Sequence, residues 1–215
     1  MVSLDAYRQN IRIEKRRAIL EAAVQVFLTE GFQNAGMAAI AKRADVSTAT
    51  LYKHFSSKDQ LFGEMVEMHV NQFQVLPVDP EKLSAHDLKQ DLKQDLKKLS
   101  VGFVNLISDQ RTLSVFRNII GEGDRFPIIQ QLIYEKGRNP FKNLLIDFLN
   151  REDVAVQLAI NDCGLAAEWY IGLLSYWLIF VPVFNPETTY SDSRISDIVN
   201  ESIEMFLARY RVPSS

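Results

Sequence analysis

The sequence has few of the residues that build disulfides, metal sites and flexible linkers. Its 215 residues include one cysteine, Cys163, which excludes an internal disulfide and a multi-cysteine zinc site. Its three histidines form no HExxH pattern, and no low-complexity tract interrupts the chain. The N-terminus has no apolar signal-peptide core. We therefore expect a folded, cytoplasmic protein with no metal and no cofactor, in which Cys163 is a small buried side chain or, alternatively, a redox sensor.

Catalytic motifs and membrane spans are also missing. Ser47 has neither a GxSxG elbow nor a nearby base, so the sequence predicts no catalytic residues and no enzyme. The uncharged run 169–184 is shorter than the about 20 residues that a spanning helix needs, and Pro182 interrupts it. We expect this run to be a helix buried on nearly all sides rather than a membrane segment.

Positive charge is concentrated near the N-terminus, although the whole chain carries −3. Residues 1–60 contain 9 Lys/Arg and 6 Asp/Glu (+3), whereas residues 61–215 contain 15 and 21 (−6). Arg8, Arg12, Lys15, Arg16 and Arg17 lie before or within the first expected helix. This basic segment is interpreted either as an arm that reaches DNA or as a solvated tail.

The segment 37–55 has the pattern of a helix-turn-helix. Apolar residues of 37–44 recur at helical spacing, Asp45 interrupts them, and Ser47 is a good N-cap for a second short helix. An amphipathic helix over 17–30, stopped by Gly31, precedes this pair, and a longer helix begins after a serine N-cap near residue 57. Small, polar and basic side chains on the second short helix would suit a DNA major groove.

Three motifs at linked spacing carry a resemblance to a known family. RRAILEAAVQVFLTEGF, MAAIAKRADVS and TATLYKHFSSKDQLF closely resemble the N-terminal DNA-binding domain of TetR-family transcriptional regulators. Two positions depart from the usual pattern. Ala35-Gly36 replaces a Thr-Ser or Thr-Thr pair, so the next helix either uses Asn34 or Gly36 as its N-cap or depends on packing. Asp45 replaces a frequent glycine. The resemblance implies that Thr48 and Ala49 contact base edges. It also implies phosphate contacts from Tyr52, Lys53, His54 and Lys58.

The remainder of the chain predicts helices only, since no alternating strand or hairpin signal is present. The fold class is therefore all-α, with a three-helix helix-turn-helix domain at 1–60 and a larger helical effector-binding and dimerisation domain at 61–215. The string at 115–149 resembles the AefR-like regulatory domain of the same family. The apolar run 169–184 and the stripe along 195–210 are expected to form one helix each, and these two helices from each of two subunits would make a four-helix dimer interface.

A small-molecule effector is expected to bind among the aromatic side chains of the second domain, most of which must otherwise be core or interface. Its predicted contacts, with an arginine as polar anchor or internal ion-pair partner, are Phe103, Phe116, Arg117, Trp169, Tyr170, Leu173 and Trp177. Such a lining favours an apolar or aromatic molecule.

The sequence thus predicts a homodimeric, ligand-responsive transcriptional regulator that represses from a palindromic DNA operator. Half-sites read by two such helices lie about 34 to 36 Å apart or a multiple of that distance. Two other hypotheses remain open: a dimeric small-molecule carrier or sensor with a vestigial DNA-binding domain, and a helical enzyme that uses the apolar cavity.

Overall fold

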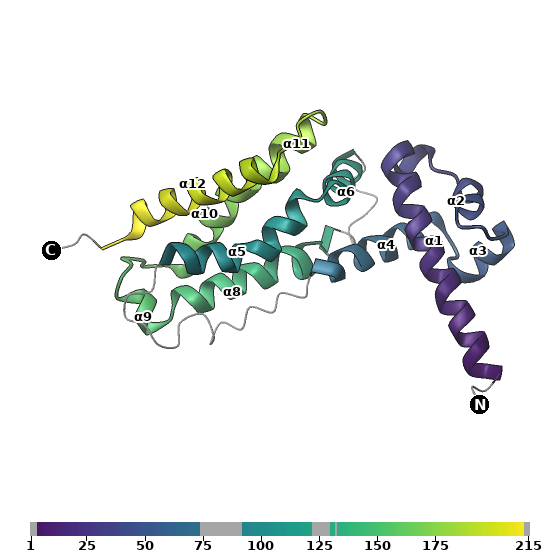
Figure 1. Cartoon of the computed structure of the whole chain (residues 1–215), viewed down its shortest axis with the longest axis horizontal. Helices are drawn as coiled ribbons and strands as arrows, with labels where there is room; N and C mark the ends of the chain where they lie inside the picture. Colours follow the sequence, from purple (N-terminus) through teal and green to yellow (C-terminus); the bar gives the residue numbers. More distant parts are fainter. Residues whose placement is uncertain (1–3, 74–91, 122–129, 132, 213–215) are drawn as a thin grey trace. The chain divides into compact units, whose positions relative to one another are not determined.

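A computed structural model describes residues 4–73, 92–121, 130–131 and 133–212. Within these residues the chain is helical apart from turns and one isolated bridge between Leu158 and Arg211. The expected all-α fold is confirmed. The helices, drawn in Figure 1, are α1 Leu4–Asn34, α2 Met37–Arg43, α3 Thr48–His54, α4 Lys58–Phe73, α5 Leu92–Ser108, α6 Gln110–Gly121, η3 Ile133–Arg138, α8 Asn139–Leu149, α9 Glu152–Ala155, α10 Cys163–Ser175, η4 Tyr176–Phe180, α11 Val181–Phe184 and α12 Asp192–Tyr210.

The chain divides into two compact units. Unit 1 comprises residues 1–69 and 118–129, and unit 2 comprises residues 70–117 and 130–215. Each unit buries its own apolar side chains.

Unit 1 is built around three aromatic rings from two helices. Phe27 and Phe32 of α1 meet Phe62 of α4, with ring centroids 5.1 to 5.6 Å apart. Ile40 of α2 and Leu51 of α3 are fully buried as well. The two short helices are thereby fixed by packing, because helices of seven residues are not stable alone.

Gly31 interrupts the helical conformation of α1 where the sequence predicts the helix to end, but the helix begins much earlier than residue 17. Gly31 has φ 71°, a conformation that costs glycine little and other residues much more. The Phe32 backbone N–H that follows donates to Oδ1 of Asn118 at 2.8 Å. Upstream, α1 continues without interruption to Leu4.

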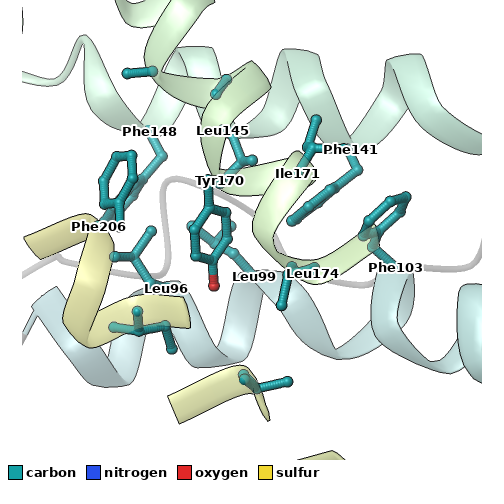
Figure 2. Close-up of a cluster of buried hydrophobic side chains, with 14 of the residues drawn as sticks. Leu96, Leu99, Phe103, Phe141, Leu145, Phe148, Tyr170, Ile171, Leu174 and Phe206 are labelled. Atoms are coloured by element: carbon teal, nitrogen blue, oxygen red, sulfur yellow. The ribbon is translucent and has the colours of Figure 1, made fainter. Parts of the chain in front are cut away.

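Unit 2 is a bundle in which α5, α8, α10 and α12 enclose one apolar core. Figure 2 shows Tyr170 of α10 at its centre, near Phe206 of α12, with its hydroxyl directed at α5. That hydroxyl lies 2.7 Å from Oγ of Ser100, which also donates to the Leu96 carbonyl. The only polar atom of this large ring is therefore satisfied inside the core.

Leu92, Leu96 and Leu99 recur at helical spacing along α5 and are buried. The apolar run that follows Cys163 forms α10, η4 and α11 in succession. By length and composition alone, Cys163–Phe184 could cross a membrane, although core helices of soluble proteins have the same properties.

Candidate nucleic-acid interface

The second helix of the helix-turn-helix, α3, is the expected recognition helix and is held at both ends by local hydrogen bonds. Oγ of Ser47 accepts from the Thr50 backbone N–H at 3.1 Å, which makes Ser47 the N-cap of α3 as expected. Asp45 takes φ 53° in the turn between α2 and α3, and the Val46 N–H then donates to the Ala41 carbonyl at 3.0 Å. Asp tolerates this left-handed conformation better than most residues. The helix N-cap of α2 is Gly36, without a side-chain hydrogen bond.

The side chains of α3 separate cleanly into an inner and an outer face. Leu51 and the following Phe55 are fully buried. Four predicted DNA contacts are exposed on the outer face: Thr48, Ala49, Tyr52 and Lys53. This face offers a hydroxyl, methyl groups, a phenol and a cation to a partner, which is chemistry suited to base edges and phosphates.

His54, the fifth predicted contact, lies half-buried at the end of α3 among cations of α1. Burial first, and then the charges of Arg12, Arg16 and Lys15, lower the pKa of His54. Its backbone carbonyl accepts from Arg16 at 3.3 Å, and the same guanidinium pairs with Glu64 and lies 4.6 Å from the Phe55 ring centroid. Arg16 thus ties α1 to the end of the recognition helix and to α4.

Lys58, the sixth predicted contact, is engaged inside unit 1. Its ammonium donates to the carbonyls of Phe32, Gln33 and Ala35 at 2.7, 3.1 and 3.0 Å, and it lies 4.6 Å from the Phe32 ring centroid. An ammonium has three protons, so these bonds account for all of them. In this structure Lys58 therefore caps backbone carbonyls at the C-terminal end of α1. The sequence motif could not show this, because the accepting carbonyls are 23 to 26 residues away.

The seven predicted effector contacts lie in different surroundings. Phe103 and Tyr170 are packed in the core, and Phe103 stacks on Phe141 at 4.5 Å between centroids. Trp169 and Trp177 are 62% and 43% exposed. Three are partly buried elsewhere in unit 2, namely Phe116, Arg117 and Leu173. Arg117 donates to the Pro182 carbonyl at 3.3 Å.

A hollow of about 270 Å³ lies instead between α5 and α12 and contains none of those seven residues. Its walls combine apolar side chains such as Val101 and Ile195 with Lys97, Asn105 and Asp192. On α10, Glu168 pairs with Arg138 and, at 2.8 Å, with Lys142. Glu168 is therefore an ion-pair partner that joins α10 to η3 and α8.

An exposed aromatic face runs along the apolar segment of unit 2. Stacked and edge contacts join Tyr176 with Trp177 and Phe180, and Phe180 with Phe184. The members with substantial exposure are Leu165, Trp169, Tyr176, Trp177, Phe180 and Phe184. An apolar patch of this kind marks an interaction surface, because isolated soluble proteins rarely leave one uncovered.

The described residues contain no group of three or more His, Cys, Asp or Glu side chains placed to hold a metal ion, and His86 lies outside them. Burial first, and then the Asp162 charge, raise the pKa of the Cys163 thiol. A thiol that stays protonated is a poor nucleophile.

A helix-turn-helix with a polar and basic outer face, joined to a separate helical bundle, defines an all-helical DNA-binding regulator. The sequence profile of "Bacterial regulatory proteins, tetR family" matches residues 19–65, and that of "AefR-like transcriptional repressor, C-terminal domain" matches residues 94–212. The chain belongs to the TetR family of transcriptional regulators.

Individual relatives agree with this assignment. The transcriptional activator FasR of Mycolicibacterium smegmatis is 47% identical over 60 residues, which cover 28% of this chain and 27% of FasR. The match thus spans about a quarter of that relative. A TetR-family regulator from Mesorhizobium loti superposes with a TM-score of 0.77 and 27% identity, covering 94% and 98% of the two chains. The Flavonoid-responsive Regulator FrrA superposes at 0.64 and 26%, covering 93% and 98%.

Proposed function

We propose that the chain is a homodimeric repressor that reads a palindromic operator through α3. The observation that carries this proposal is the outer face of α3, where Thr48, Ala49, Tyr52 and Lys53 are exposed while Leu51 anchors the opposite side. One recognition helix contacts only part of a major groove, so two copies related by a twofold axis are needed for tight binding.

Dimerisation would use the exposed aromatic face of α10, η4 and α11 together with α12. Aromatic side chains are enriched at the centres of protein interfaces, where their burial supplies much of the association energy. The same burial would account for an apolar segment that resembles a membrane span by length. A cytoplasmic location follows for a protein that works on DNA.

An apolar or aromatic effector would release the operator. The flavonoid response named for FrrA supports an aromatic ligand, and the AefR-like profile is described as that of a repressor. In the present arrangement Phe103 and Tyr170 fill the core, so a ligand that uses them has to separate Phe103 from Phe141. Such a ligand can change operator affinity only by its preference for one arrangement over the other, about 1.4 kcal/mol for each tenfold change.

The first test is selection of tight-binding sites from random double-stranded DNA, followed by titration of the winner and a scrambled duplex at physiological salt. We expect a palindrome bound about a thousandfold or more tightly than the scrambled control. In vitro transcription from a promoter carrying that palindrome then separates repression from activation, the role that FasR has by name. Failure to enrich any sequence, with and without a flavonoid panel, would favour a carrier with a vestigial DNA-binding domain.

A further inference from the structure

Most described side chains of α1 before Ile19 are exposed, although Arg16 contacts α3 and α4. Ile19 is the first fully buried residue of α1, whereas Tyr7 and Ile13 are 61% and 58% exposed. The preceding part of α1, from residue 4 to residue 18, is about 22 Å long at 1.5 Å per residue. Figure 1 shows this end of α1 continuing past α2 and α3. Exposed turns of a helix gain little stability from tertiary packing, so a partner that covers them would stabilise them.

Three cations form a stripe along this exposed part of α1. At 100° per residue, Arg12 and Lys15 lie within about 40° of Arg8 around the helix axis. All three are exposed, and within the described residues none of them makes an ion pair. Arg17 lies about 180° from Arg8 on the same helix and pairs with Glu21 at 2.7 Å. The stripe is therefore confined to one side of α1.

The stripe adjoins the recognition helix. The charges of Arg12 and Lys15 act on His54, the last residue of α3, and contribute to its lowered pKa after burial. Arg16 fixes this junction through the His54 carbonyl and Glu64. Positive charge thus continues from Lys53 of α3 onto α1 within unit 1, whereas the lowered pKa of His54 favours its neutral form.

We propose that Arg8, Arg12 and Lys15 bind the phosphate backbone of the DNA that flanks the half-site read by α3. This inference rests on the proposed DNA-reading function and adds a second contact to it. Seven residues of helix span about 10 Å, which matches the rise of about three base pairs. The stripe presents cations without carboxylate partners, so its binding partner is a polyanion. The anionic groups of that partner are phosphates, because the proposed function places the α3 side of unit 1 against DNA.

The test compares operator binding by wild type, the triple variant Arg8→Ala/Arg12→Ala/Lys15→Ala and the control Arg17→Ala over a series of salt concentrations. Two duplexes are used: the selected palindrome trimmed to its half-sites, and the same palindrome with several additional base pairs on each side. Alanine keeps the helical propensity of these positions, and circular dichroism checks that the helix remains. Sedimentation checks that the oligomeric state is unchanged.

On the longer duplex, the triple variant should lose about 0.9 from the slope of log K against log salt for each phosphate contact removed, roughly 5 for six contacts in a dimer. On the trimmed duplex it should resemble wild type, and Arg17→Ala should resemble wild type on both. Equal slopes for wild type and triple variant on the longer duplex would overturn the inference while leaving operator reading intact. A change of oligomeric state in the triple variant would also overturn it, by identifying a second copy as the partner. Absence of sequence-specific binding by wild type would instead refute the proposed function.

Discussion

The two units present opposite kinds of surface to their partners. In unit 1 the outer face of α3 is polar and basic and its buried side chains are apolar, so the polarity of a side chain indicates whether it is exposed. In unit 2 the core and the exposed aromatic face are both apolar. Tyr170 and Trp169 are adjacent in the sequence, yet Tyr170 is buried and Trp169 is exposed. A hydrophobic pattern therefore separates surface from core in unit 1 but cannot separate interface from core in unit 2.

The largest expected effect tests the apolar surface of unit 2. Trp177→Glu places a charge in the centre of the proposed dimer interface, and we expect it to weaken association by about 2 to 4 kcal/mol for each copy, with loss of operator binding. Sedimentation equilibrium and DNA titration measure both. The matched control is Val156→Glu, because Val156 directly follows the short helix α9, is 75% exposed and is not a member of that face. A dimer that survives Trp177→Glu would assign the aromatic face to another partner.

The next effect tests whether cations of unit 1 serve DNA or the fold. Lys58→Ala removes the donor to three carbonyls at the end of α1, and we expect a loss of about 2 to 3 kcal/mol of unfolding free energy with little change in the salt slope of DNA binding. Lys53→Ala should do the reverse, because Lys53 is exposed on α3. Urea unfolding and salt titration of both variants decide the matter. A lowered salt slope with unchanged stability in Lys58→Ala would restore the phosphate contact predicted from the sequence motif.

A smaller effect concerns the polar pair within the core of unit 2. Tyr170→Phe removes one partner of the bond to Ser100, while Ser100 keeps its bond to the Leu96 carbonyl, so a loss of about 1 kcal/mol is expected. Ser100→Ala leaves the phenol buried without that partner and should cost more, about 1 to 3 kcal/mol. Denaturant unfolding of both single variants and the double variant measures the coupling. Purely additive losses would show that the two hydroxyls do not support each other.

Sequence-local interactions were predictable, and long-range ones were not. The caps at Ser47 and Gly31 and the core positions Leu51 and Phe55 follow from spacing within a few residues. The carbonyl partners of Lys58 and the Asn118 bond to Phe32, 86 residues away, depend on packing that no local pattern encodes.

The predicted effector contacts illustrate the same limit. The sequence placed Trp169, Tyr170 and Leu173 on one apolar segment, but adjacent residues of a helix point about 100° apart, so Trp169 and Tyr170 face different neighbours. Only the neighbouring helices determine that Tyr170 is enclosed and Trp169 is not. The spacing of aromatic residues therefore identified apolar helices without identifying a pocket.

The smallest expected effect returns to a local feature of unit 1, the turn at Asp45. The positive φ at this position favours glycine, but glycine also loses more conformational entropy on folding. These two contributions of Asp45→Gly nearly cancel, so the free energy of unfolding should change by no more than about 0.5 kcal/mol. Asp45→Ala keeps the Cβ but removes the short polar side chain that lets Asp adopt this conformation. We expect it to lower the free energy of unfolding by about 1 kcal/mol. Denaturant unfolding compares the two variants. If alanine proved as stable as glycine, the turn would have to relax to negative φ, and α3 would then shift against α2, which operator titration of the same variants would detect as lost affinity.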